Sequence, residues 1–146
     1  MEYDLAMVTK PPHEAYDPVV ETYASGGEED PAFRARVRDL LVTLSPGKRV
    51  LEVGCGPGSD SATLSEHGME VTAIDLSSEF IAYAQRTHQG VDFRCMDMRT
   101  PEFEEGAFHG ILGVACFCHL TSQEVSATLP CYQRLLCEGG VIVLAI

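Results

Sequence analysis

Glycines stand at alternate positions directly after a short apolar run, in the sequence VLEVGCGPGSD of residues 50–60. Together with Glu52, two residues before the first of them, Gly54, Gly56 and Gly58 form the pattern E-x-G-x-G-x-G. Glycine is needed where the backbone turns sharply and where a ligand must approach without meeting a Cβ atom. A helix that begins after such a loop presents free N–H groups to an acceptor. The pattern therefore predicts a cofactor site at the carboxyl end of a buried strand.

The spacing of these glycines separates classes of cofactor. A dinucleotide fingerprint has the form G-x-G-x-x-G, and here Gly54 and Gly56 match its first two positions whereas Ser59 occupies the third. A Walker A loop is excluded because no Gly-Lys-Ser or Gly-Lys-Thr follows. A nicotinamide-dependent oxidoreductase is therefore the least favoured interpretation.

An acidic residue, Asp75, ends the next apolar run. A carboxylate at this position can accept hydrogen bonds from both hydroxyls of a ribose. Leu76 and Phe80, which follow it, could form one wall of a purine site. The alternative is that Asp75 caps a helix that starts at Ser77.

A second acidic residue, Asp97, ends the third apolar run, in the sequence FRCMDM. Its carboxylate could accept a hydrogen bond from an adenine amino group, and the backbone N–H of Met98 could reach the ring. The alternative is that Asp97 is a turn residue without a ligand.

Apolar runs and helical periodicity alternate along the chain. We predict strands over residues 49–53, 69–74, 91–95, 110–115 and 141–146, and helices over 31–45, 59–67, 78–87 and 122–137. Asp30 is expected to cap the first helix, and Pro130 to kink or restart the last one. This alternation predicts an α/β fold, with a parallel sheet covered by helices on both faces.

The charge of the chain is strongly negative and uneven. The 146 residues carry a formal net charge of −12, and more than half of it falls in residues 1–30, where Lys10 is the sole basic residue. We predict an acidic N-terminal arm over 1–30 and a folded body over 31–146. The charge argues against nucleic acid and an anionic membrane surface as partners. No signal peptide, membrane span or disulfide-scaffold spacing is visible, so we expect a cytoplasmic protein.

From Val50 to Ile146 the sequence resembles the class I S-adenosylmethionine-dependent methyltransferases, and among them the small-molecule branch. VLEVGCGPGSD matches the first motif of that branch, VTAIDLSSEF the second and FRCMDM the third. LLCEGGVIVLAI matches the helix, Gly-Gly and strand that follow, and Tyr16, Asp17 and Tyr23 resemble a segment often found upstream.

The resemblance implies a Rossmann-like fold, S-adenosylmethionine (SAM) as cofactor, no metal, and methyl transfer to a small molecule or a protein. It also implies a role for each matching residue. Those expected at the methionine end are Glu52, Gly54, Cys55, Gly56 and Ala115, those at the ribose and adenine are Asp75, Asp97 and Met98, and Tyr23 is expected to close over the cofactor from the arm.

His119 lies where the acceptor pockets of this family open, so it could act as a base or could cap the next helix. The cluster Cys116-Phe-Cys-His119 lacks a second pair of ligands, so we expect no metal there. The other histidines (His13, His67, His88 and His109) are expected at the surface or in turns.

The family normally continues with two more strands after the fifth. The sequence is therefore expected to lack the C-terminal strands, which would leave the fifth strand as a sheet edge that can pair with another copy. The alternative to an enzyme is a non-catalytic SAM-binding or interaction module.

Overall fold

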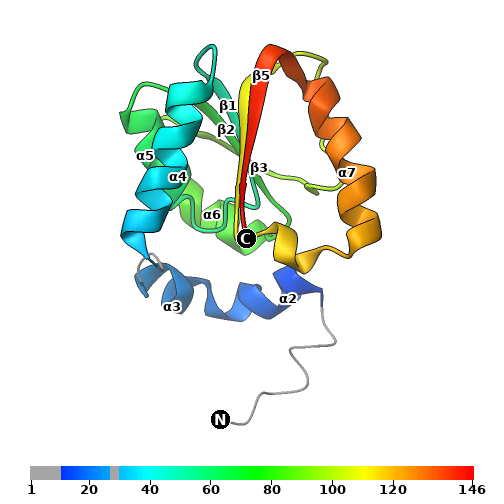
Figure 1. The fold of residues 1–146 in the computed structure, drawn as a ribbon. Coiled ribbons are helices and arrows are strands. Elements are labelled where there is room, and N and C mark those ends of the chain that lie inside the picture. The colour runs from blue at the N-terminus through cyan, green and yellow to red at the C-terminus, as the bar shows by residue number, and fades with distance from the viewer. Residues whose placement is uncertain (1–10, 27–29) are drawn as a thin grey trace.

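The computed structural model describes residues 11–26 and 30–146 (Figure 1). Residues 1–10 and 27–29 of the predicted acidic arm lie outside the described residues. The helical elements are α2 (Pro12–Tyr16), the 3-10 helix η1 (Asp17–Val19), α3 (Val20–Ser25), α4 (Pro31–Leu44), α5 (Ser59–Glu66), α6 (Ser78–Thr87), the 3-10 helix η2 (Phe117–His119) and α7 (Ser122–Leu135). The strands are β1 (Arg49–Val53), β2 (Glu70–Asp75), β3 (Asp92–Cys95), β4 (Phe108–Val114) and β5 (Leu136–Ala145).

The described strands form one parallel sheet in the order β3-β2-β1-β4-β5. Helices α4, α5 and α6 cover one face, where Leu41 and Leu64 pack on Val50 and its neighbours. Helix α7 covers the other face, where Tyr132 and Leu135 pack on Leu51 (Figure 1). Successive residues of β1 thus enter opposite cores, because side chains alternate across a strand. The predicted α/β fold, with helices on both faces of a parallel sheet, is confirmed.

Side-chain caps fix where three of the helices begin. Asp30 accepts a hydrogen bond from the Phe33 N–H at 3.0 Å, as predicted for the start of α4. Ser77 caps α6 by accepting from the Phe80 N–H at 3.1 Å. A capping box starts α7, in which Thr121 and the residue three positions later exchange hydrogen bonds.

Most boundaries lie within about two residues of the predicted ones, and the clearest differences are at β5 and at Pro130. β5 begins at Leu136 rather than at residue 141, because Leu136 pairs with Phe108 before the register shifts. Helix α7 runs unbroken through Pro130, so the predicted restart does not occur. Tyr132 and Leu135, both fully buried, hold the last turn of α7 in the core, and this packing offsets the one backbone hydrogen bond that proline removes.

The described part of the arm runs across the carboxyl ends of the strands as α2, η1 and α3 (Figure 1). Val20 is buried at this junction, and the Oγ of Ser77 donates a hydrogen bond to the carboxylate of Asp17. At the outer side Arg86 pairs with Glu21 at 3.2 Å. This described part of the arm therefore lies against α6.

Candidate functional site

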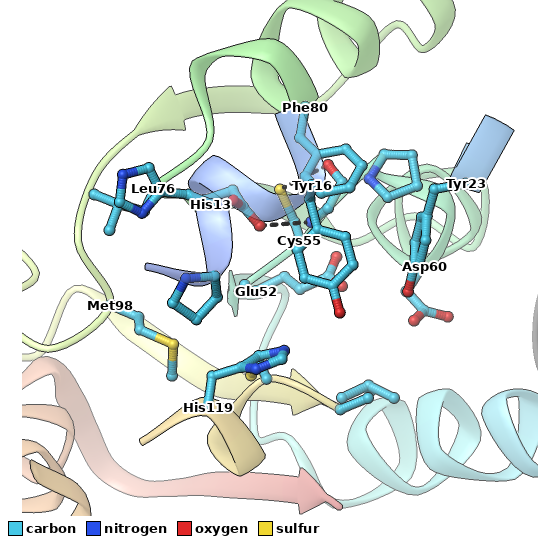
Figure 2. Close-up of a pocket in the computed structure, with 18 of the residues that line it drawn as sticks. His13, Tyr16, Tyr23, Glu52, Cys55, Asp60, Leu76, Phe80, Met98 and His119 are labelled. Atoms are coloured by element: carbon cyan, nitrogen blue, oxygen red, sulfur yellow. Dashed lines mark hydrogen bonds between the residues drawn. The ribbon is translucent and has the colours of Figure 1, made fainter. Parts of the chain in front are cut away.

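A cavity of about 690 Å³ opens at the carboxyl ends of the strands, between the arm and the sheet (Figure 2). All of the cofactor residues predicted from the sequence line it except Gly58, and His119 lines it as well. Residues far apart in the chain therefore meet around one space. The lining predicted from the sequence comprises Tyr23, Glu52, Gly54, Cys55, Gly56, Asp75, Leu76, Phe80, Asp97, Met98, Ala115 and His119.

Gly54 and Gly56 make the turn of the loop after β1, with φ angles of +64° and +53°. A Cβ atom at Gly54 would overlap the Cβ of Cys116, so glycine is required by both space and backbone conformation. A Cβ at Gly56 would meet no atom within 4 Å, because this residue faces the open cavity. The loop thus brings bare backbone to the space where a ligand would lie.

Gly58 has a different surrounding from its neighbours. It is buried, has a φ of +86° and lies beneath the cavity instead of lining it. A Cβ there would lie 2.8 Å from the ring of Phe93 and 3.1 Å from the Cβ of Ala84. The structure therefore shows a packing reason for glycine at this position, and Gly58 is not among the residues that line the cavity.

Asp75 joins the end of β2 to the glycine loop. One carboxylate oxygen accepts from the Gly56 N–H and the other from the Ser77 N–H, both at 2.9 Å. Burial raises the pKa of the Asp75 carboxyl, and the two N–H donors oppose that rise. The cap of α6 is Ser77 itself, so the alternative reading of Asp75 as that cap is wrong. The carboxylate instead lies fixed at the cavity wall.

Glu52 lies buried on β1, with 3% of its surface exposed. The Oγ of Ser61 donates a hydrogen bond to its carboxylate. Burial raises the pKa of Glu52 to about 8, and the negative charge of Asp60 adds to the rise. Burial also raises the pKa of the neighbouring Cys55 thiol, whose own N–H donates to the Ile74 carbonyl at 3.0 Å.

Asp60 is a residue of this cavity that the sequence analysis did not identify. It is 2% exposed and pairs with both Arg34 and Arg38 of α4. The two arginines are four residues apart and so lie on one face of the helix. The sequence contains a signal for this ion-pair group: two arginines four residues apart on one helix, and an acidic residue just after the glycine loop.

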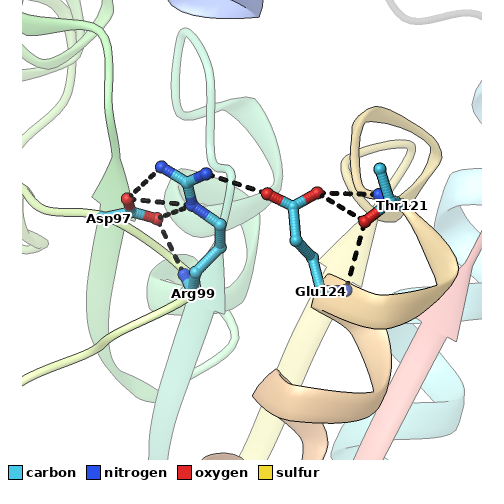
Figure 3. Close-up of polar contacts among 4 residues, drawn as sticks. All are labelled: Asp97, Arg99, Thr121 and Glu124. Carbon is cyan, nitrogen blue, oxygen red and sulfur yellow. Dashed lines mark hydrogen bonds and ion pairs between the residues drawn. The ribbon is translucent and has the colours of Figure 1, made fainter.

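A chain of polar contacts borders the cavity between the end of β3 and α7 (Figure 3). The carboxylate of Asp97 accepts from the Arg99 backbone at 2.8 Å and from its guanidinium at 2.6 Å. Arg99 also donates to Glu124 at 3.0 Å, and Glu124 accepts from the Thr121 N–H at 2.8 Å. The Arg99 hydrogen bond lowers the pKa of the Asp97 carboxyl. Asp97 is therefore both a turn residue and part of the cavity wall.

Two backbone carbonyls at the cavity wall have defined positions. The hydroxyl of Tyr132 donates to the Met98 carbonyl at 2.7 Å, which ties the loop after β3 to α7. Ala115 has a φ of +53°, and its N–H donates to the Ala145 carbonyl at 2.8 Å. A ligand at Ala115 can therefore use only its carbonyl, which also accepts from the Cys118 thiol at 3.3 Å.

Aromatic rings from the arm and the body meet over the cavity (Figure 2). Tyr23 lies edge-on to Phe80 at 5.6 Å between ring centroids, and Tyr16 lies edge-on to His119 at 5.9 Å. Tyr16 has no predicted site role, and His13 is predicted at the surface or in a turn, yet both residues line the cavity. Their helix is short and weakly periodic, so only the fold shows which way they face.

The described residues contain no group of three or more His, Cys, Asp or Glu arranged to hold a metal ion. In the same residues, no helix is both long enough and apolar enough to cross a membrane.

A sequence profile described as a methyltransferase domain matches residues 50–140, which include the glycine loop, β2, Asp97 and α7. The chain belongs to the class I S-adenosylmethionine-dependent methyltransferases. The match covers more than half of the chain and starts in β1, the strand that leads into the cavity.

Named relatives agree with this assignment. The ubiquinone biosynthesis O-methyltransferase of Dechloromonas aromatica is 33% identical over 112 residues, which is 73% of this chain and 47% of that protein. The malonyl-[acyl-carrier protein] O-methyltransferase of Erwinia billingiae is 31% identical over 104 residues, or 69% of this chain and 39% of that protein. The chain thus spans less than half the length of these relatives.

The fold is also that of a solved methyltransferase. The sugar N-methyltransferase KedS8 from Streptoalloteichus superposes with a TM-score of 0.71 at 25% identity, over 84% of this chain and 51% of that one. These relatives differ in the acceptor that their names give, so the family alone does not identify the acceptor of this chain.

Proposed function

We propose that the cavity binds SAM and that the protein transfers the cofactor's methyl group to a small-molecule acceptor. The observation that carries the proposal is the fixed carboxylate of Asp75, bound to the Gly56 N–H at 2.9 Å beside open, Cβ-free backbone. A carboxylate in this place suits the two hydroxyls of a ribose, and the adjacent cavity of about 690 Å³ has room for the rest of the cofactor.

The end of the cavity near the glycine loop and the end near β3 carry different groups, and each set suits a different part of the cofactor. Near the glycine loop, Glu52 and the Ala115 carbonyl are acceptors, which suit the methionine ammonium group. Near the end of β3, Leu76 and the backbone of Met98 offer an apolar wall and a polar edge to adenine. The lining carries more carboxylates than cations, which favours a cofactor that bears a sulfonium charge.

When bound, SAM supplies a methyl group on sulfur that is already activated for displacement, with S-adenosylhomocysteine as the product. The part of this chain is then to hold cofactor and acceptor in line, which can accelerate the reaction by several orders of magnitude. For an acceptor that must lose a proton, the ring of His119 at the cavity is our candidate base. The cap of α7 is Thr121, so His119 does not fill the capping role that was its alternative.

Calorimetric titration with SAM, S-adenosylhomocysteine and NAD tests the cofactor. We expect S-adenosylhomocysteine to bind, and Asp75→Ala to weaken binding at least about tenfold through loss of a charged acceptor. Asp92→Ala is the matched control, because Asp92 is an exposed acid on β3 that does not line the cavity. Binding of NAD alone would overturn the proposal.

Transfer of labelled methyl groups to neutral phenols, amines and carboxylic acids then tests catalysis. Transfer to any of them supports the enzyme. Tight S-adenosylhomocysteine binding without transfer to small molecules or proteins would favour the non-catalytic SAM-binding module instead.

We further propose that the described part of the arm, residues 11–26, covers the bound cofactor. The contacts of Tyr16 and Tyr23 with Phe80 support this proposal.

A further inference from the structure

His13 carries a buried polar atom that has no hydrogen-bond partner in the part of the chain that the structure describes. Its Nδ1 is the only buried side-chain nitrogen or oxygen without a hydrogen-bond partner among residues 11–26 and 30–146. Buried polar atoms in folded proteins nearly always have a partner, and an exception calls for an explanation such as a ligand. The ring of His13 lines the cavity, so its partner can come from a molecule bound there.

The fold holds His13 over the cavity. It is three residues before Tyr16 in α2, so the two side chains share one face of the helix. That face is fixed by the Tyr16 ring, which packs 5.9 Å from Phe80 on α6 and 5.9 Å from His119 on the opposite side. Figure 2 shows His13 among the side chains that surround the cavity.

His13 lies near the end of the cavity that we assign to adenine. His13 lines the cavity together with Leu76 and Met98, and Figure 2 shows the three on the same side of it. Both oxygens of Asp97 already accept from Arg99. A further hydrogen-bond acceptor at this end of the cavity would therefore help to bind the amino group of an adenine base.

We propose that Nδ1 of His13 forms a hydrogen bond with the amino edge of the adenine base, which makes His13 a specificity residue for the cofactor. The inference rests on the proposed function. A neutral imidazole with its proton on Nε2 accepts at Nδ1 from the adenine amino group, and no proton transfer is needed. A base with a carbonyl at that position, as in inosine, offers no donor to it.

The experiment compares two ligands on four proteins. S-adenosylhomocysteine and S-inosylhomocysteine are titrated into the wild type, His13→Ala, His13→Asn and Glu14→Ala. Glu14 is the matched control, because it is an exposed neighbour in the same helix and does not line the cavity. His13→Asn retains a hydrogen-bonding group near the position of Nδ1. Thermal melting of each variant shows that it is folded.

We expect His13→Ala to weaken S-adenosylhomocysteine binding about three- to tenfold, and to change S-inosylhomocysteine binding less than about twofold. His13→Asn should recover part of the loss, and Glu14→Ala should change neither affinity. Equal losses for both ligands would overturn the inference, because they indicate a structural role of α2. Unchanged binding in His13→Ala would also overturn it while the proposed function stands, whereas failure of the wild type to bind S-adenosylhomocysteine would refute the proposed function itself.

Discussion

Gly54, in the loop after β1, lies so close to Cys116, just after β4, that a Cβ atom on the glycine would overlap the Cβ of the cysteine. Cys116 is buried, and its thiol donates to the Val53 carbonyl at 3.3 Å. The loops that follow the adjacent strands β1 and β4 are therefore in contact, and this contact requires glycine at position 54. Both residues line the cavity, at the end that we assign to the methionine part of the cofactor.

Gly54→Ala is expected to destabilise the fold by about 3 kcal/mol, because the new methyl group must displace Cys116 and φ stays positive. Gly56→Ala is the control. Gly56 also has a positive φ but faces open space, so we expect this substitution to destabilise the fold by only about 1–2 kcal/mol. Urea denaturation measures both, and equal losses for the two variants would show that the contact with Cys116 has no energetic weight.

Asp60→Ala is expected to cost about 3 kcal/mol of unfolding free energy. The substitution leaves Arg34 and Arg38, both largely buried, without their shared carboxylate. Asp39→Ala, at an exposed position of α4, should change stability by less than about 0.5 kcal/mol. Thermal and urea unfolding measure the difference, and a stability for Asp60→Ala close to that of the wild type would contradict the proposed ion-pair group.

Glu52 predicts how stability depends on pH. Burial raises the pKa of its carboxyl from 4.5 to about 8 in the folded protein, so the folded state binds the proton more tightly than the unfolded chain does. Its contribution to stability is complete below pH 4.5 and is lost as pH rises toward about 8.

Glu52→Gln should remove this dependence, because glutamine is neutral at every pH. We expect the wild type to lose a few kcal/mol relative to Glu52→Gln between pH 5 and about 8. Glu70→Gln, an exposed change on β2, serves as the control and should leave the pH profile as it is. Parallel profiles for the wild type and Glu52→Gln would show that Glu52 titrates as it does in water.

Glu124→Gln separates the cap of α7 from the contact with Arg99. Glutamine can still accept from the Thr121 N–H in a capping box, but it carries no charge to pair with the guanidinium. We expect little change in melting temperature and a several-fold loss of S-adenosylhomocysteine affinity, because Arg99 would hold Asp97 less firmly. Arg94→Gln, which breaks an exposed pair with Asp92 away from the cavity, should leave affinity unchanged.

Much of the fold was predictable from the sequence because its signals are local. The apolar run of β1, the cap at Asp30 and the helical stripe of α4 each depend on neighbours within a few residues. The start of β5 was not predictable, since it depends on pairing with Phe108, far away in the chain. The continuation of α7 past Pro130 without a restart was not predictable for a similar reason, because it depends on the core packing of Tyr132.

By itself the sequence determined the class of fold, the glycine loop, the acid that ends β2 and the acid in the loop just after β3. These features were readable because apolar runs and glycine patterns are recognised from a few adjacent residues. Only the tertiary structure decided which glycine faces the cavity and which packs beneath it, as Gly56 and Gly58 do. It also brought His13 to the cavity and Asp60 to its two arginines. Contacts of this kind join segments distant in the chain, and their geometry exists only once the sheet has set the strand order.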